Sequence, residues 1–334
     1  MPQVSPCERV APDRRVMGLQ KILVIQSKRE GIMMLSLFRK LLFIAVLFGL
    51  LFWSVSKARS GPPVKTPMRY ELALVLGGGA ALGYAHLGVL KVLEGNGVHP
   101  DLIVGTSIGA IIGGNYAAGI PIETLIAHAQ QINIFRLLHF KILGLGFISW
   151  EKTEAYFRTN LDHKTFADLA IPFAAVATDL YSGEEVVLNS GDVVKAMLAS
   201  ASVPGIYTPV KIGEHLLVDG GLVDDLPVRA ARKLGARYVI AVDVHHPLIR
   251  ESIKTPLDVI RQAFYILHQN YAENAGKLAD VVIRPDLHDL SYTKFSAANK
   301  GIEVGAAAAR KKLPEIRALI QKISIDSSNR TGKK

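Results

Sequence analysis

Short apolar runs alternate with longer amphipathic stretches along this chain from about residue 70 onward. Runs in which successive residues are all hydrophobic predict strands buried on both faces, because such strands need no polar positions. The predicted strands are residues 72–76, 102–104, 173–178 and 238–244, together with 185–188 and 215–218. The helical patterns between them are residues 84–93, 108–118, 121–131, 150–161, 193–199 and 227–234. This alternation predicts an α/β fold of three layers, α/β/α, in which helices cover both faces of a mainly parallel central sheet.

The same patterns divide the chain into five parts. Residues 1–60 form a basic N-terminal segment with an apolar stretch at 41–56, and residues 61–70, which include Gly-Pro-Pro, predict an extended linker. The main α/β domain is predicted at residues 71–250. Residues 251–322 predict a helical C-terminal region, with helical patterns at 256–274 and 303–312. The polar residues 323–334 predict a flexible tail.

The apolar stretch at residues 41–56 carries no charge and is flanked by basic residues on both sides. A helix of this length spans about 24 Å, less than the roughly 30 Å of a bilayer core, so an anchor would need local thinning and snorkelling of its flanks. Because the basic excess precedes the stretch, an anchor would place the main domain outside the cytoplasm, on the periplasmic side in a bacterium. The alternatives are a buried or interfacial helix and a secretory signal cleaved near Ala58, which has an ordinary length if translation starts at Met33 or Met34.

Composition and charge narrow the classes of function. Hydrophobic residues make up 49% of the chain and charged residues 20%, which suits a globular protein and excludes a wholly disordered one. The net charge is +10, but residues 1–65 hold eleven Lys and Arg against three acidic residues and so carry +8 of it. The folded part is close to neutral, and no nucleic-acid partner is expected. With Cys7 alone, the chain allows no internal disulfide and no cysteine metal site.

The first chemical motif is Gly105-Thr106-Ser107-Ile108-Gly109, a G-x-S-x-G sequence between a predicted strand and a predicted helix. A sharp turn there projects the serine hydroxyl out of the sheet, and the two glycines let neighbouring backbone pass close by. The helix that follows directs unpaired N–H groups toward negative charge near Ser107. The motif predicts Ser107 as a nucleophile, and a glycine-rich turn without catalytic function is the other interpretation.

The second motif is Gly77-Gly78-Gly79, directly after the first predicted strand. Consecutive glycines allow several N–H groups to point into one cavity, where they would stabilise an oxyanion. A dinucleotide-binding loop is the rival interpretation, but the glycine at 83 is one residue off the G-x-G-x-x-G spacing, and no acidic residue ends a second strand. Gly77, Gly78 and Gly79 are therefore predicted to be oxyanion donors.

The third motif is Asp219-Gly220-Gly221, after the strand predicted at 215–218. A carboxylate at a strand end with two glycines behind it can be held in a tight turn beside another loop. Alone, an Asp-Gly turn is usually structural. Together with a serine elbow and a glycine-rich loop, and with no obvious histidine partner, Asp219 becomes the candidate base for Ser107.

The remaining polar residues that could take part in chemistry are expected to have structural functions instead. Asp179 and Asp243 stand at strand ends, where core or turn positions are expected, and His86 is expected to pack within its helix. His245 and His246 look like a metal-binding pair, but adjacent residues on a strand point to opposite faces. No metal and no cofactor are therefore predicted.

Four blocks of this sequence resemble the patatin-like phospholipase family, in particular its bacterial members related to neuropathy target esterase. Residues 74–90 resemble the family's oxyanion segment, 95–110 its nucleophile segment, 199–205 a structural block, and 218–228 its Asp-Gly-Gly block. The resemblance covers roughly residues 72–245. It implies a Ser107–Asp219 dyad, no calcium requirement and an ester substrate that is commonly a lipid. Leu82 stands where many relatives have Arg or Lys, so any contribution of that cation is absent.

The function expected from these motifs is that of a serine acyl hydrolase of the phospholipase A or lysophospholipase type. It would act through an acyl-enzyme on a lipid or ester substrate, with a membrane surface as partner. Whether it has protein partners cannot be read from the sequence. One alternative is an α/β-hydrolase lipase whose triad uses His245, His246, His268 or His288, although only about thirty residues separate the first strand from Ser107. The other is a non-catalytic, membrane-anchored module.

Overall fold

The computed structural model describes residues 69–132, 134–141, 144–245, 253–254, 256–290 and 295–331. The N-terminal segment, its apolar stretch and nearly all of the predicted linker lie outside these ranges. Within them, no helix is both long enough and apolar enough to cross a membrane.

Within the described ranges, the central sheet has eight strands and is mixed, although mainly parallel. Its order is β11-β10-β1-β2-β5-β9-β8, and β6 also pairs with β5. The strands β11, β10, β1, β2 and β5 run parallel, whereas β6 and β9 are antiparallel to β5, and β8 is antiparallel to β9. The bounds are β1 (Tyr70–Leu76), β2 (Leu102–Thr106), β5 (Phe173–Asp179), β6 (Glu185–Leu188), β8 (Val210–Ile212), β9 (His215–Asp219), β10 (Ala236–Val242) and β11 (Val281–Ile283).

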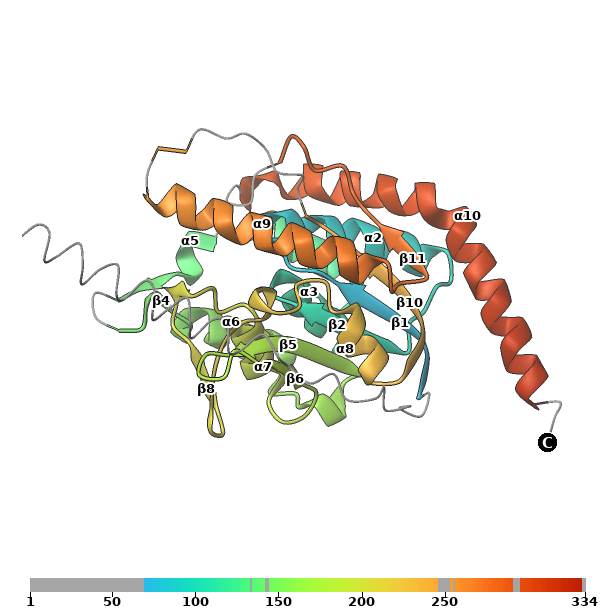
Figure 1. The fold of residues 1–334 in the computed structure, drawn as a ribbon, viewed down its shortest axis with the longest axis horizontal. Helices are drawn as coiled ribbons and strands as arrows, with labels where there is room; N and C mark the ends of the chain where they lie inside the picture. The colour runs from blue at the N-terminus through green and yellow to red at the C-terminus, as the bar shows by residue number, and fades with distance from the viewer. Residues whose placement is uncertain are drawn as a thin grey trace, which may run out of the picture. The chain divides into compact units, whose positions relative to one another are not determined.

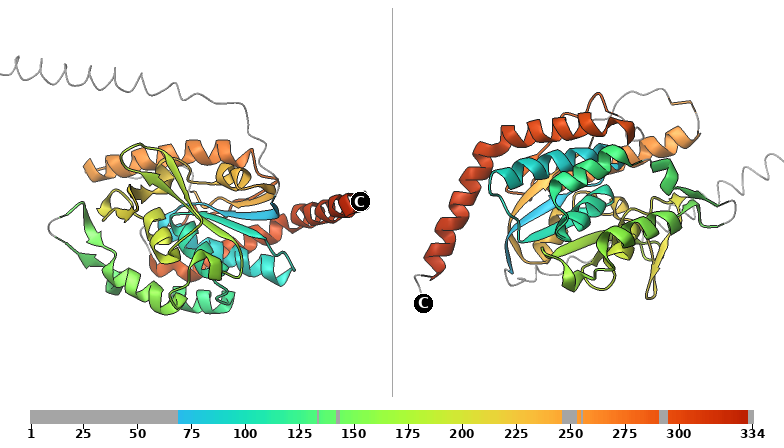
Figure 2. Two further views of the ribbon diagram at one scale, coloured as in Figure 1. Left: turned by 90° about the horizontal axis from the view of Figure 1, so that it is seen from below. Right: turned by 180° about the vertical axis from the view of Figure 1, so that it is seen from behind.

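Helices cover both faces of this sheet (Figure 1), because alternate side chains of a strand point to opposite sides. Leu74 and Leu76 of β1 belong to the larger core, which they share with α2 (Tyr84–Gly95), α3 (Ile108–Ala117), α4 (Ile122–Gln131), α7 (Val193–Ser200) and α10 (Ala298–Thr331). Ala73 and Val75 belong to the smaller core, with α8 (Val228–Lys233) and α9 (Pro256–Gly276). Figure 2 (left) shows the orange α9 on one side of the sheet and the green α6 (Glu151–Leu161) on the other.

Two elements in the C-terminal part differ from the helical region and tail predicted there. Residues 251–322 contain β11, which extends the main sheet beside β10; a three-residue apolar run has no period by which to recognise it. The predicted tail continues α10 as helix as far as Thr331. Asp326 holds this end of α10 on the sheet, since its carboxylate accepts hydrogen bonds from Arg237 Nη2 at 2.7 Å and from the Tyr238 hydroxyl.

A second, three-stranded sheet lies beside the main body and was absent from the sequence prediction. It consists of β3 (His139–Phe140), β4 (Gly146–Ser149) and β7 (Gly205–Tyr207), with β4 central. The pairing of β3 with β4 covers two residues of β3, and β7 pairs with β4 from more than fifty residues away. Such a pairing leaves no local pattern in the sequence.

Candidate active site

Ser107 occupies the turn between β2 and α3 in a strained backbone conformation. Its φ of 54° and ψ of −121° lie in a region that non-glycine residues rarely adopt. The turn is held in place because the Ser107 N–H donates to Ser200 Oγ at 2.9 Å, and that hydroxyl donates to Val176 O at 2.5 Å. A Cβ on Gly105 would lie 2.5 Å from the backbone of Gly109, so the turn closes only with glycine there. The predicted serine elbow is present.

Asp219 ends β9, on the far side of β5 from the Ser107 strand. Its side chain is buried, and Oδ1 accepts a hydrogen bond from the Gly221 N–H at 2.8 Å. Thr178 Oγ1 donates to the Asp219 carbonyl at 2.9 Å and fixes the main chain. A Cβ on Gly220 would lie 2.2 Å from Val176 O. The glycine therefore lets the end of β9 pack tightly against β5, close to the serine turn.

The Asp219 carboxyl has the Ser107 hydroxyl as a neighbour, and its pKa reflects that neighbour and its burial. Burial raises the pKa of Asp219 to about 7, and the negative charge of Asp225 adds to this, whereas hydrogen bonds from the Gly221 N–H and the Ser107 hydroxyl lower it. Within the described residues, Asp219 Oδ2 has no hydrogen-bond partner. Hydrogen bonds between catalytic groups are often long or poorly aligned before a substrate binds. The pair thus offers a carboxylate that can accept a proton near neutral pH.

The glycine-rich loop offers fewer oxyanion donors than predicted. The Gly77 N–H donates to Val242 O at 3.1 Å, and the Gly78 N–H donates to Asp225 O at 3.0 Å, so neither amide is available to an oxyanion. The Gly79 N–H donates to no backbone carbonyl in the described part of the chain. The loop packs on the end of β10 and on the turn after Asp219, and these long-range contacts take up the first two amides.

His86 supports this loop from α2, which agrees with its predicted packing function. Its Nε2 lies 2.9 Å from Gly77 O, and the ring is fully buried. Burial is the main cause that lowers the pKa of His86 to about 4. A neutral ring donates an N–H to the carbonyl and so helps to fix the glycine-rich loop.

A cavity of about 220 Å³ opens beside Ser107 and is lined mainly by apolar side chains. Its walls come from α2, α3, α4 and α6, and the chain around residues 201–207 closes it. The rings of Trp150 and Tyr207 stack in its wall at 4.0 Å with planes 7° apart. The lining side chains are those of Ala80, Tyr84, Leu87, Ile108, Ile111, Ile112, Asn115, Leu125, His128, Ala129, Ile132, Leu137, Trp150, Thr153, Tyr156, Phe157, Asn160, Ala201, Val203, Tyr207 and Phe295.

The other sequence candidates lie outside this cavity. Asp179 Oδ2 pairs with His215 Nδ1 at 2.5 Å, where β5 ends and β9 begins. His245, His268 and His288, the described histidines of the alternative triad, do not line the cavity wall that carries Ser107; His246 lies outside the described residues. The α/β-hydrolase triad therefore gains no support from the position of these rings.

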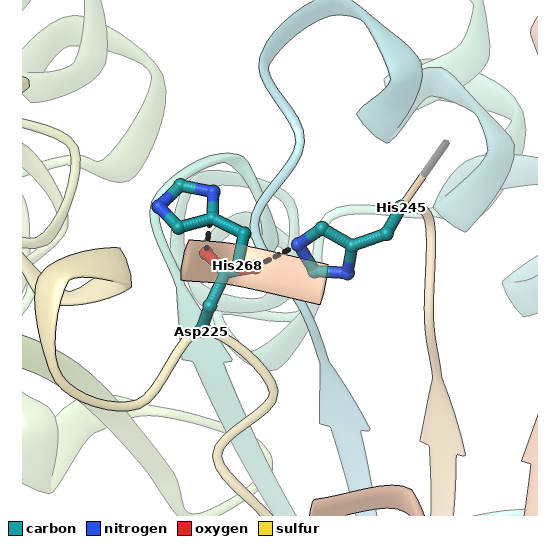
Figure 3. A group of neighbouring side chains, drawn as sticks. All are labelled: Asp225, His245 and His268. Atoms are coloured by element: carbon teal, nitrogen blue, oxygen red, sulfur yellow. Dashed lines mark ion pairs between the residues drawn. The ribbon is translucent and has the colours of Figure 1, made fainter. Parts of the chain in front are cut away.

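Sequence reasoning missed Asp225, which lies with His245 and His268 behind the glycine-rich loop (Figure 3). The signal that could have found it is the Asp224-Asp225 pair, two acidic residues within an otherwise apolar segment after Gly221. Asp225 is 1% exposed. A carboxylate buried to this degree needs a partner that balances its charge.

Comparisons with known proteins agree with these motifs. Residues 74–232 match the family model described as patatin-like phospholipase. An uncharacterized NTE family protein of Mycobacterium tuberculosis is 38% identical over 179 residues, which cover 52% of this chain and 49% of that protein. The lysophospholipase NTE1 of Debaryomyces hansenii is 28% identical over 275 residues, covering 72% of this chain and 18% of that protein. The chain thus matches about half the length of the first relative and much less of the second.

Among solved structures, VipD from Legionella pneumophila shares the fold. The TM-score is 0.51 at 12% sequence identity, and the match covers 77% of this chain and 72% of that one. At this identity the likeness concerns the α/β architecture alone.

Proposed function

The chain belongs to the patatin-like phospholipase family, and from this premise we propose that it hydrolyses lipid esters with Ser107 as nucleophile and Asp219 as base. One observation carries the proposal: a serine in a strained turn lies near a buried carboxyl and also on the wall of an apolar cavity. This arrangement supplies a nucleophile, a proton acceptor and a place for an acyl chain.

In the proposed reaction, Ser107 Oγ attacks the ester carbonyl while its proton passes to Asp219 Oδ2. Oδ1 stays bound to the Gly221 N–H, which orients the carboxyl. The tetrahedral oxyanion accepts hydrogen bonds from the Gly79 N–H and from the Ile108 N–H, which starts α3 and has no acceptor within that helix. The alcohol leaves with the proton from Asp219, and a water activated by Asp219 then releases the fatty acid from the acyl-enzyme.

The size of the cavity supports a substrate with one acyl chain inside and its head group outside. Its volume of about 220 Å³ is below the roughly 300–1,000 Å³ of pockets that enclose whole drug-sized ligands. Leu82, which replaces the basic residue of many relatives, is 1% exposed and part of the core. It offers no charge to a head group.

An exposed apolar patch beside the cavity supports action at a lipid surface. Phe140, Leu145, Phe147 and Ile206 are exposed by 69%, 65%, 70% and 44%. Phe147 and Ile206 are neighbours in the parallel pairing of β4 with β7, and β7 ends at the Tyr207 ring of the cavity wall. Exposed apolar patches of this kind mark interaction sites. We call these four residues the hairpin patch and assign it to the membrane surface.

The N-terminal segment completes the proposal. The apolar stretch at residues 41–56 would act as a membrane anchor that holds the catalytic domain outside the cytoplasm, and secretion after cleavage is the alternative. Fractionation of cells that express the full chain, followed by protease treatment of intact spheroplasts, tests this. Membrane-bound protein that is protected from the protease would contradict the proposed orientation.

The dyad is tested with Ser107→Ala and Asp219→Asn in the full chain, assayed on a short p-nitrophenyl ester and on lysophospholipid. Both variants should lose activity by at least about a thousandfold, since each removes a group that acts in the transition state. Substitution of His245, His246, His268 and His288, one at a time and assayed in variants that still fold, separates the dyad from a triad, because only a triad uses one of these rings as the base. Labelling of Ser107 by a fluorophosphonate probe tests the non-catalytic alternative. Full activity of either dyad variant would refute the proposal.

A further inference from the structure

A second group of polar side chains lies behind the glycine-rich loop, away from the cavity. Asp225 follows η3 (Gly220–Leu222), His245 follows β10, and His268 belongs to α9. One oxygen or nitrogen of each lies within 4.8 Å of the others. Figure 3 shows both rings turned toward the Asp225 carboxylate. Three separate elements therefore direct metal-binding atoms to one point.

The contacts at this point are not those of an ordinary hydrogen-bonded cluster. His245 Nε2 touches Asp225 Oδ2, and His268 Nδ1 lies 3.9 Å from Asp225 Oδ1. Apart from this ion pair, neither Asp225 oxygen nor His245 Nε2 has a hydrogen-bond partner within the described residues. The Asp225 side chain is 1% exposed and that of His245 is 7% exposed. Buried lone pairs without hydrogen bonds are costly unless another group uses them.

The outer contacts of His245 favour a metal ligand. Its Nδ1 lies 2.7 Å from Asp243 Oδ1, and Arg284 Nε donates to Asp243 Oδ2 at 2.8 Å. A proton on Nδ1 leaves the Nε2 lone pair directed at Asp225. A carboxylate that orients a ligating imidazole in this way is a common support of metal sites, and it fixes the tautomer that the metal requires.

We propose that Asp225, His245 and His268 bind a divalent transition-metal ion, with Zn²⁺ as the best fit. Two imidazoles and one carboxylate suit zinc, whereas calcium and magnesium prefer oxygen ligands. The surroundings leave little space: a Cβ on Gly78 would lie 2.2 Å from Asp225 Oδ1, and one on Gly221 would lie 3.0 Å from His268 Nε2. A confined site favours the four ligands of zinc over an octahedral set. As the ion binds, His245 Nε2 gives up any proton it carries and moves from contact with Asp225 to share the metal.

Such an ion would tie together the turn after Asp219, the end of β10 and helix α9. Asp225 also accepts the Gly78 N–H through its carbonyl, so the site lies directly behind the proposed oxyanion loop. The inference does not depend on hydrolysis, because metal content and stability are read without a substrate.

The test uses the full chain, purified in detergent with a tag that contains no histidine. The metal is removed with a chelator, and the protein is titrated with Zn²⁺ and, separately, with Co²⁺. We expect one Zn²⁺ per chain by elemental analysis, a higher Tm with zinc, and visible cobalt absorption typical of four-coordinate nitrogen and oxygen ligands. His268→Ala, a change at the most exposed of the three ligands, should weaken zinc binding at least about tenfold, as His245→Gln should. His288→Ala, at a ring 62% exposed and outside the cluster, is the matched control and should bind zinc normally.

Each outcome decides the matter. No stoichiometric zinc and no cobalt absorption in the wild-type chain would overturn the proposal and leave His245 as a cation between Asp225 and Asp243. Zinc binding that survives both His268→Ala and His245→Gln would place the ion elsewhere and would overturn it equally. The wild-type titration needs no variant, so a variant that fails to fold does not remove the test.

Discussion

Asp219→Asn should make the protein more stable, by an amount that grows with pH. Asp219 has a pKa of about 7 in the folded chain against an ordinary value of 3.8, chiefly because it is buried. Its ionised form is therefore disfavoured in the folded state relative to the unfolded one. At 1.36 kcal/mol per pH unit, this difference amounts to roughly 4 kcal/mol. Asparagine has a similar shape and does not ionise, so the variant escapes this cost.

The sign and the pH window follow from the two pKa values. Below about pH 4, Asp219 is protonated in both states, and ionisation costs nothing. Between about pH 4 and 7 the unfolded chain has lost the proton while the folded chain keeps it, so the wild type loses about 1.4 kcal/mol per pH unit relative to the variant. Above about pH 7 the carboxyl is ionised in both states, and the difference stays constant at its full size.

The assay is urea unfolding of both proteins, followed by tryptophan fluorescence at half-unit steps from pH 4 to 8.5. Asp286→Asn is the control for a general effect of removing an acidic residue, because that side chain is 82% exposed. A stability difference between wild type and Asp219→Asn that is flat from pH 4 to 7 would show that the carboxyl ionises as easily in the folded chain as in the unfolded one. The reasoning about a buried base would then be wrong.

Three further outcomes are expected. For wild-type protein, kcat/KM on a soluble ester should rise with pH through an apparent pKa of about 7, because protonated Asp219 cannot accept the serine proton; a profile that is flat from pH 5 to 8 would contradict this. Ser200→Ala removes the acceptor of the Ser107 N–H. It should lower kcat several-fold and the free energy of unfolding by about 1 kcal/mol. Unchanged esterase kinetics would show that the serine turn keeps its geometry without this hydrogen bond. Phe147→Ser should reduce hydrolysis of phospholipid vesicles about tenfold and leave hydrolysis of a soluble ester unaffected. The control is Tyr181→Ser, at an aromatic ring 80% exposed outside the hairpin patch, which should change neither activity. Equal loss of activity on both substrates would show that Phe147 acts in folding and not at the membrane.

Most strands of the main sheet could be predicted because each is a run of consecutive apolar residues, a pattern that is visible without knowledge of the rest of the fold. Successive apolar residues in β1, β2, β5 and β10 show burial on both faces, and each predicted run matches a strand to within two residues at either end. The serine elbow also depends on neighbours in sequence, since Gly105 and Gly109 lie on either side of Ser107. Information of this kind is local, and a single sequence carries it.

Two of the strands that the sequence analysis missed or assigned to helix form through pairings distant in sequence. The segments β7 and β11 have three residues each, too few to show a period, and become strands only because β4 and β10 offer them edges. The end of α10 was predicted as a tail because its residues are polar. It is helical where Asp326 meets Arg237 and Tyr238 on the sheet.

The site divides in the same way between local and tertiary information. The motifs alone named Ser107 and Asp219, but only folding could bury the carboxyl beside β5 and so move its pKa toward neutrality. From the sequence, all three glycines were expected to donate to the oxyanion. In the folded chain, the N–H groups of two of them donate to the carbonyls of Val242 and Asp225 instead. The amino-acid sequence determines which chemical groups are present. Burial and long-range hydrogen bonds, which need the whole tertiary structure, decide which of those groups remain free to react.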